Sequence, residues 1–176
     1  FLSTKINGIY TPILFEDIVK FMEEHDDIYI VTDTKNIDKD TVIMQFKKIK
    51  EIVDATGNPE IYDRIIIQLY HYEMIEWVKS VHKFDNYIIT LYQMQNIDYE
   101  YLGKYCKDNG IDVVTMPEVS CKPEISETLH KYGLKVYAHT INRIKTLDNL
   151  NKYFYVDGFY TDFISPDDLN KFGYAK

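Results

Sequence analysis

The alternation of two kinds of segment along the chain constrains its fold more than any other feature. Six short runs rich in β-branched and aromatic residues are each about five to seven residues long, which is typical of strands. They are almost continuously apolar, so we expect helices to cover both faces of the sheet that they form. The predicted strands are residues 28–32, 64–70, 87–92, 111–116, 135–141 and 158–163.

Segments with helical periodicity fill the gaps between these runs. Residues 14–25, for example, place Phe15, Ile18, Val19 and Met22 on one apolar stripe. Strands and helices therefore alternate, which predicts an α/β domain with a parallel sheet, either an open doubly wound sheet or a (β/α) barrel. No Gly-rich nucleotide-binding loop follows any predicted strand. The other predicted helices are residues 41–55, 72–84, 99–109, 123–132 and 147–153, and a last short helix that Ser165-Pro166 opens.

The composition predicts one globular domain over residues 1–176. Apolar residues make up 45% of the chain, and no apolar run approaches the roughly 18 residues that span a bilayer. The formal net charge of −8 argues against non-specific nucleic-acid binding, which needs a basic face.

The two cysteines, Cys106 and Cys121, fit reduced thiols, and we favour a cytoplasmic location. The excess of Ile, Lys, Asn and Tyr resembles a low-GC bacterial codon bias. Because the chain begins with Phe1 rather than Met, we expect its natural start to lie upstream.

The first predicted strand is followed by two opposite charges, Asp33 and Lys35. Residues two apart on a strand point to the same side, so we expect the two side chains to lie together. A carboxylate there suits Mg²⁺ or Ca²⁺, although one carboxylate rarely holds such an ion alone. A lysine there can offset charge that builds on a phosphoryl oxygen, which makes Lys35 the catalytic candidate. The alternative is an ordinary salt bridge at a strand end.

Polar or aromatic residues also stand at the ends of later strands, where functional groups gather in both architectures. Gln68 can orient a hydroxyl or a phosphate, and Tyr70 and Tyr92 can form the wall of a pocket for a polyol. His139 and Asn142 stand at the end of the fifth strand. Core packing is the alternative for the two tyrosines, and a hydrogen-bonded core position is the alternative for His139. The residues alone supply no convincing pair of a general acid and a general base.

Four motifs, taken in order, resemble the glycerophosphodiester phosphodiesterase family. Residues 136–142 (V-Y-A-H-T-I-N) and 156–163 (V-D-G-F-Y-T-D-F) are similar to the family's carboxy-terminal strands V-x-x-W-T-x-N and G-V-D-G-I-x-T-D. Residues 10–18 resemble its P-x-L-x-E-x-L helix, and Asp33-x-Lys35 resembles its E-x-K strand. The similarity extends over nearly the whole chain.

The resemblance implies a TIM-type barrel and a metal-dependent hydrolysis, within lipid metabolism, of glycerophosphodiesters to glycerol 3-phosphate and an alcohol. Asp33 matches the third acidic ligand of the family's divalent cation, Mg²⁺ or Ca²⁺, with Asp in place of the usual Glu. Lys35 matches the lysine that contacts the phosphate, and His139 stands where many members carry a pocket tryptophan. The other residues that we carry over as substrate-binding candidates are Gln68, Tyr70, Tyr92 and Asn142.

The family carries its two catalytic histidines and an acidic metal pair on its first two barrel strands, in an H-R-G segment, an E-x-D segment and a following H-D pair. We expect none of these in residues 1–176, so that the first two strands do not precede the first predicted strand. Residues 1–176 then hold strands three to eight of eight and, alone, are inactive and bind the cation weakly or not at all. We expect upstream residues to supply the missing strands, and homodimerisation through open barrel edges in their absence. The alternative is a non-catalytic module that binds a phosphate or a polyol on a partial barrel.

Overall fold

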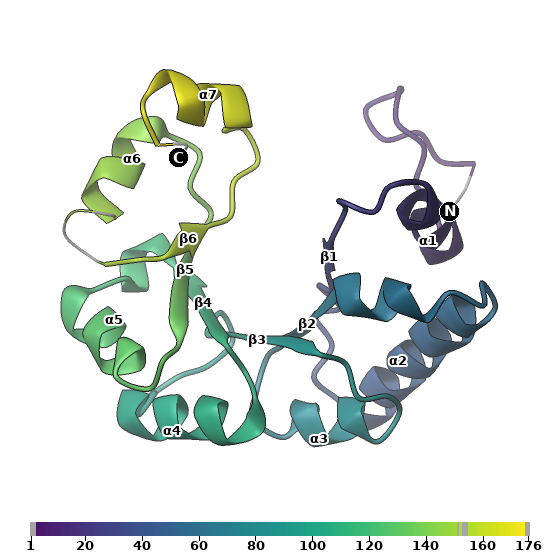
Figure 1. Cartoon of the computed structure of the whole chain (residues 1–176), viewed down its shortest axis with the longest axis horizontal. Coiled ribbons are helices and arrows are strands. Elements are labelled where there is room, and N and C mark those ends of the chain that lie inside the picture. Colours follow the sequence, from purple (N-terminus) through teal and green to yellow (C-terminus); the bar gives the residue numbers. More distant parts are fainter. Residues whose placement is uncertain (1–2, 151, 153–154, 175–176) are drawn as a thin grey trace. The chain divides into compact units, whose positions relative to one another are not determined.

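The sheet consists of six strands that follow one another in chain order (Figure 1). The structure, a computed structural model, describes residues 3–150, 152 and 155–174. Every strand pair described is parallel. A doubly wound sheet reverses its strand order at a switch point, whereas the strands of a (β/α) barrel lie in chain order. The order is therefore that of a partial TIM-type barrel. The strands are β1 (Ile30–Val31), β2 (Ile65–Leu69), β3 (Asn86–Thr90), β4 (Val113–Pro117), β5 (Lys135–His139) and β6 (Gly158–Phe159).

Helices alternate with these strands, as the sequence predicts. Two short 3-10 helices, η1 (Pro59–Arg64) and η2 (Glu118–Ser120), are additions that the periodicity does not predict. Residues 151 and 153 of the predicted helix 147–153 lie outside the described residues. The α-helices are α1 (Phe15–Glu24), α2 (Lys39–Asp54), α3 (Met74–Lys79), α4 (Tyr99–Asn109), α5 (Pro123–His130), α6 (Ile144–Asn149) and α7 (Pro166–Lys171).

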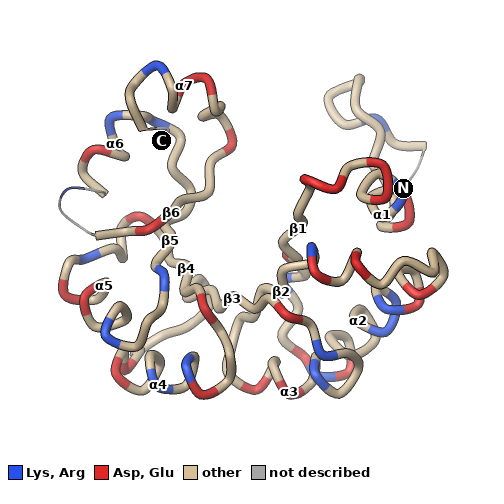
Figure 2. The backbone as a smooth tube through the Cα atoms, in the orientation of Figure 1, with Lys and Arg blue, Asp and Glu red and all other residues tan. Residues whose placement is uncertain are grey.

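Capping residues set the ends of α2 and α4. The Asp38 side chain accepts a hydrogen bond from the Thr41 backbone N–H at 2.9 Å and begins α2. Asp98 caps α4 in the same way, and Gly110, with a φ of +71°, ends it. Acidic and basic residues are interspersed along the helices (Figure 2), as expected for elements with faces that meet water.

The chain divides into two compact units, of which the first comprises residues 1–67 and 73–86. Its β1 pairs with β2, where Ile30 lies opposite Ile65, and α2 packs against both α1 and α3. The buried rings of Phe46 and Phe84 meet edge to face with their centroids 5.9 Å apart. This unit therefore has an apolar core of its own.

The second unit comprises residues 68–72 and 87–176 and contains the ladder from β3 to β6. Helix α4 packs against α5, and Gly103 permits a close approach there, since a Cβ on Gly103 would lie 2.3 Å from a ring carbon of Tyr132. The register pairs Pro117 with His139 at the ends of β4 and β5. His139 therefore stands where the strands of this unit end.

In each unit, side chains near the starts of the strands link neighbouring segments by hydrogen bonds. We call the side of each unit at which its strands start the strand-start edge. In the first unit the Arg64 guanidinium precedes β2. Its Nη1 donates to the carbonyl oxygens of Met22 at 2.9 Å and His25 at 2.7 Å. These carbonyls lie at the end of α1, which has no basic residue in its last turn, so Arg64 supplies the missing cap.

A carboxylate has the corresponding role in the second unit. The Oδ2 atom of Asp157 accepts a hydrogen bond from the Val136 backbone N–H at 2.7 Å, beside the start of β5. The same oxygen lies 2.8 Å from Nε2 of His130, the last residue of α5. Asp157 thus joins a strand, a helix end and the segment before β6.

Candidate active site

In the first unit the pair Asp33 and Lys35 lies in the loop after β1. The Nζ atom of Lys35 is 3.5 Å from Oδ2 of Asp33, so the two side chains lie together as expected. The backbone differs from the predicted strand, because β1 ends at Val31 and Lys35 has a φ of +58°. A turn through the left-handed region, rather than strand alternation, brings the charges together.

Exposure decides what this ion pair can do. The Lys35 side chain is 68% exposed and that of Asp33 is 53% exposed. An exposed ion pair contributes about 0–1 kcal/mol to stability, so the fold does not depend on it. Both groups are instead accessible to a ligand, the carboxylate to a cation and the ammonium to an anion.

Asp33 has the chemistry of a metal ligand but does not make a complete site for a divalent cation. Mg²⁺ and Ca²⁺ take six or more oxygen ligands, often from several carboxylates. Among the residues that the structure describes, no group of three or more His, Cys, Asp and Glu side chains is placed to hold a metal ion. These residues therefore do not by themselves fit the ion.

In the second unit Gln68 and Tyr70 lie at the end of β2. The Gln68 Nε2 donates to the Tyr70 hydroxyl oxygen at 3.0 Å. Both residues are buried, with 8% and 2% of their surfaces exposed. The buried ring of Tyr70 is part of the core, and the hydrogen bond from the Gln68 amide satisfies the Tyr70 hydroxyl oxygen. Their contact with a substrate stays a prediction.

A row of aromatic rings stands at the strand ends of the same unit. The rings of Tyr92 and His139 have centroids 6.4 Å apart, and those of His139 and Tyr160 are 6.1 Å apart and nearly parallel. Tyr92 is 65% exposed. Aromatic faces and exposed hydroxyl groups suit a polyol, so this row is the described surface that best fits the predicted pocket wall.

Asn142 joins two strand-end loops of this unit. Its Oδ1 accepts hydrogen bonds from the Asp162 backbone N–H at 2.8 Å and from the Thr161 hydroxyl at 3.2 Å. Its Nδ2 donates to Oδ2 of Asp162 at 3.0 Å. The carboxamide of Asn142 is therefore engaged within the protein, and a direct contact with substrate stays a prediction.

Tyr160 is the site residue that the sequence analysis missed. It follows β6 directly and faces His139, but an isolated tyrosine in a chain with 16 of them carries no signal of its own. The prediction that the chain contains neither the family's E-x-D segment nor its H-D pair is wrong at the level of the letters, because Glu24-His25-Asp26 contains both. This tripeptide lies at the end of α1, where the His25 ring packs on Phe21 at 4.1 Å, and not at a strand end.

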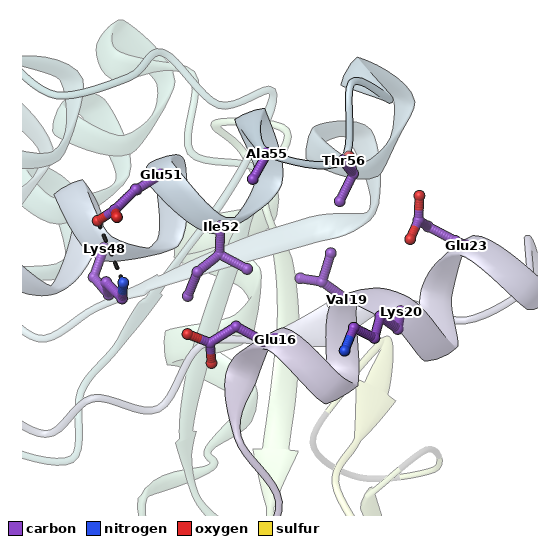
Figure 3. Close-up of a pocket in the computed structure, with 9 residues that line it drawn as sticks. All are labelled: Glu16, Val19, Lys20, Glu23, Lys48, Glu51, Ile52, Ala55 and Thr56. Atoms are coloured by element: carbon purple, nitrogen blue, oxygen red, sulfur yellow. Dashed lines mark hydrogen bonds and ion pairs between the residues drawn. The ribbon is translucent and has the colours of Figure 1, made fainter.

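A groove lies between α1 and α2 of the first unit, and none of the predicted site residues lines it (Figure 3). Its volume is about 390 Å³. Val19, Ile52 and Ala55 give it an apolar lining, and an ion pair of 3.4 Å between Lys48 and Glu51 stands at its side. It is a helix–helix groove whose polar lining consists mainly of lysine and glutamate side chains. Its other lining residues are Glu16, Lys20, Glu23 and Thr56.

Comparison with known proteins gives a likeness in structure alone. No protein-family model matches the chain, and no curated protein matches it in sequence. Solved structures do match with probability 1.00. A Galdieria sulphuraria protein described as a candidate glycerophosphodiester phosphodiesterase superposes with a TM-score of 0.77 at 15% identity, covering 97% of this chain and 67% of its own.

Two further structures show the same likeness. The glycerophosphodiester phosphodiesterase from Parabacteroides distasonis matches with a TM-score of 0.69 at 11% identity, over 97% of this chain and 66% of its own. That from Agrobacterium tumefaciens matches with a TM-score of 0.57 at 17% identity, over 92% and 62%. The chain spans 58–67% of the length of four of the solved structures that it matches. The expected resemblance to this family is confirmed at the level of the fold.

Proposed function

We propose that residues 1–176 form the larger part of a glycerophosphodiester phosphodiesterase, whose complete form hydrolyses glycerophosphodiesters to glycerol 3-phosphate and an alcohol. The likeness in fold over 97% of the chain carries this proposal, together with four sequence motifs in the family's order. In the reaction, water adds to phosphorus, the bond from phosphorus to the alcohol oxygen breaks, and the alcohol leaves with a proton.

Lys35 is the residue to which we assign a catalytic role in this chain. Its exposed ammonium suits a phosphoryl oxygen, where negative charge increases as the bond to water forms. Asp33 at 3.5 Å holds the ammonium in place and is the residue that we assign to the divalent cation. The cation, when bound, would neutralise charge on the phosphate. Its remaining ligands must come from other groups.

To the aromatic row of the second unit we assign the wall of a pocket for a polyol. His139 replaces the tryptophan of the family motif, which shortens the wall and adds a titratable ring. Tyr92 is the most exposed member of the row. We assign to Gln68, Tyr70 and Asn142 the support of this wall or contact with the substrate.

Residues 1–176 alone should be inactive, because no H-R-G segment occurs in them. The test is an assay of glycerophosphocholine hydrolysis with Mg²⁺ or Ca²⁺, next to a calorimetric titration with glycerol 3-phosphate. Saturable binding without turnover supports the proposal. Robust turnover would show that the assignment of missing catalytic groups is wrong, and absence of both would remove the phosphodiester site.

A longer chain separates this proposal from the non-catalytic alternative. If residues encoded ahead of Phe1 contain the H-R-G segment, the extended protein should hydrolyse the substrate. An extended protein that binds glycerol 3-phosphate but has no turnover would instead be a binding module. The hydrolysis assay and the calorimetric titration together distinguish these two outcomes.

The exposed edge of β1 supports a proposal on assembly. Tyr29 and Val31 are 61% and 41% exposed, although Val31 belongs to a strand. An open strand edge pairs readily with another chain, so we propose that residues 1–176 form a homodimer on their own. Light scattering during gel filtration tests this, and a monomer at high concentration would contradict it.

The two thiols support our proposal of a cytoplasmic location. Both cysteines are free and buried, and burial raises the pKa of Cys106 to about 12 and that of Cys121 to about 11. Protonated thiols in a core suit a reducing compartment. Within the described part of the chain, no helix is both long and apolar enough to cross a bilayer.

A further inference from the structure

The aromatic row of the second unit stands on two loops, one after β5 and one after β6. Backbone hydrogen bonds connect them first: the Tyr160 N–H donates to the Ala138 carbonyl at 2.9 Å, and the Ile141 N–H donates to the Tyr160 carbonyl at 2.7 Å. The next contacts along the chain come from the side chain of Asn142. A carboxamide thus extends the pairing of the two strands into their loops.

We propose that Asn142 is a positioning residue, which holds the loop after β6 and thereby keeps the Tyr160 ring against His139. The inference rests on the proposed function, in which the rings of His139 and Tyr160 form part of the wall of the substrate pocket. It differs from the predicted role of Asn142, in which this residue contacts the substrate itself.

The chemistry of the network explains why an asparagine stands at this position. The Asn142 Oδ1 has two lone pairs, and it receives the Asp162 N–H and the Thr161 hydroxyl. Its Nδ2 donates to the Asp162 carboxylate, which can only accept. An aspartate at position 142 would keep the first two bonds but would place a second carboxylate against Asp162.

The Thr161 hydroxyl transmits this contact to the rest of the loop. Its oxygen accepts hydrogen bonds from the backbone N–H groups of Ile164 at 3.0 Å and Phe163 at 3.2 Å, while its proton goes to Asn142. The turn that follows β6 is therefore tied to the loop after β5 through one side chain. Tyr160 directly precedes this turn, so a loose turn allows the ring to leave His139.

A reciprocal exchange of side chains tests the proposal. Asn142→Asp places two carboxylates about 3 Å apart, and the repulsion should open the turn. Asp162→Asn is the matched control, since its amide still offers an oxygen to Asn142. The double variant Asn142→Asp/Asp162→Asn restores one amide and one carboxylate in exchanged positions, with every hydrogen bond of the network available again.

Two readouts keep this inference separate from the proposed function. The first needs no ligand: NMR measures the exchange of the backbone amides of residues 162–164 and the contact between the rings of His139 and Tyr160. The second is calorimetric binding of glycerol 3-phosphate. If the wild-type protein does not bind this probe, the proposed function fails, while the first readout still decides the role of Asn142.

Asn142→Asp should speed exchange of these amides about tenfold, as loss of about one hydrogen bond predicts, and weaken the contact between the rings. The double variant should return both values to those of the wild type.

Acidification below about pH 5 should also restore the wild-type values in Asn142→Asp, because one of two adjacent carboxylates then takes up a proton. Thr161→Val, which removes the hydroxyl, should loosen the same amides and serves if Asn142→Asp does not fold. Wild-type exchange in both Asn142→Asp and Thr161→Val, or a folded double variant without recovery, would overturn the proposal.

Discussion

Charged groups at the strand-start edges of the units differ from those at the strand-end edges in what they contact. At the strand starts, Arg64 donates to carbonyl groups at the end of α1, and Asp157 accepts from a backbone N–H and faces His130. After the strand end of the first unit, Lys35 has an ion pair of 3.5 Å and is 68% exposed. The first arrangement satisfies backbone groups, and the second leaves charge accessible to a ligand.

This difference indicates how the position of a polar residue relates to its role in a barrel of this kind. In (β/α) barrels residues at strand starts serve stability, and residues at strand ends serve binding and catalysis. The second unit adds a refinement, because Asn142 stands at a strand end and yet satisfies backbone and side-chain groups. A strand-end position alone therefore does not identify a residue that contacts substrate.

The largest effect on stability should come from the strand-start edge of the first unit. Arg64→Leu removes two short, charge-assisted hydrogen bonds and leaves carbonyl groups of Met22 and His25 without them. We expect a loss of about 1.5–3 kcal/mol in the free energy of unfolding, measured with urea. Lys48→Leu, on the exposed face of α2, is the control and should change stability by about 0.5 kcal/mol or less. An Arg64 variant as stable as the control would remove the distinction between the edges.

The strand-end edge should show the opposite behaviour. Lys35→Gln should weaken glycerol 3-phosphate binding at least about tenfold, or about 1.4 kcal/mol, because an ammonium that faces phosphate is lost. Its free energy of unfolding should stay within about 0.5 kcal/mol of the wild type. Lys48→Gln controls for net charge. Equal affinity in the two variants would assign the phosphate to another place.

Asp157 offers a matched test in the second unit. Asp157→Asn keeps the size of the side chain and an acceptor for the Val136 N–H, but loses the charge beside His130. Because this contact is partly exposed, we expect a loss of about 0.5–1 kcal/mol in urea unfolding. Binding of glycerol 3-phosphate should not change. A loss of affinity without a loss of stability would contradict the role of the strand-start edge.

The sequence predicted the order of elements well because that order depends on local patterns. Helix α4 has the predicted bounds, since Asp98 begins it and Gly110 ends it. The strand after α1 is shorter than expected, and Lys35 adopts a left-handed conformation that strand alternation does not include. Local patterns thus locate elements better than they fix the geometry beyond an element's end.

The candidate site was less predictable because its contacts are not local. Asn142 and Asp162 are 20 residues apart, and only the pairing of β5 with β6 brings their loops together. Tyr160 becomes a candidate solely through its ring contact with His139. Sequence patterns showed which residues stand at strand ends, and the register showed which of them touch.

A smaller effect of pH should appear at the strand-start edge of the first unit. The His82 ring stacks on Tyr62 with centroids 4.0 Å apart, and burial lowers the pKa of His82 from 6.5. The unfolded chain then takes up the proton more readily, so stability is complete above pH 6.5 and falls as the pH drops through and below that value. Urea unfolding at pH 7.5 and pH 5.5 should show the fall, and His82→Phe should reduce it. An unchanged pH dependence in that variant would assign the effect elsewhere.

The smallest effect concerns the thiols. Because the pKa of each cysteine is raised, Cys106 and Cys121 should be almost entirely protonated at pH 7 and slow to react with iodoacetamide. Mass spectrometry should find both alkylated quickly in urea and slowly in the native protein. Fast native alkylation of either would contradict its burial.

The central claim is that residues at the strand-start edges serve stability and residues at the strand-end edges serve binding. NMR of the labelled chain during titration with glycerol 3-phosphate tests it most directly. We predict saturable shifts in the loops that follow strands, at Lys35 in the first unit and at Tyr92 and His139 in the second. Residues around Arg64, around Asp157 and along the groove between α1 and α2 should not shift. Shifts confined to the strand-start edges or to that groove, or no saturable shift at all, would contradict the account.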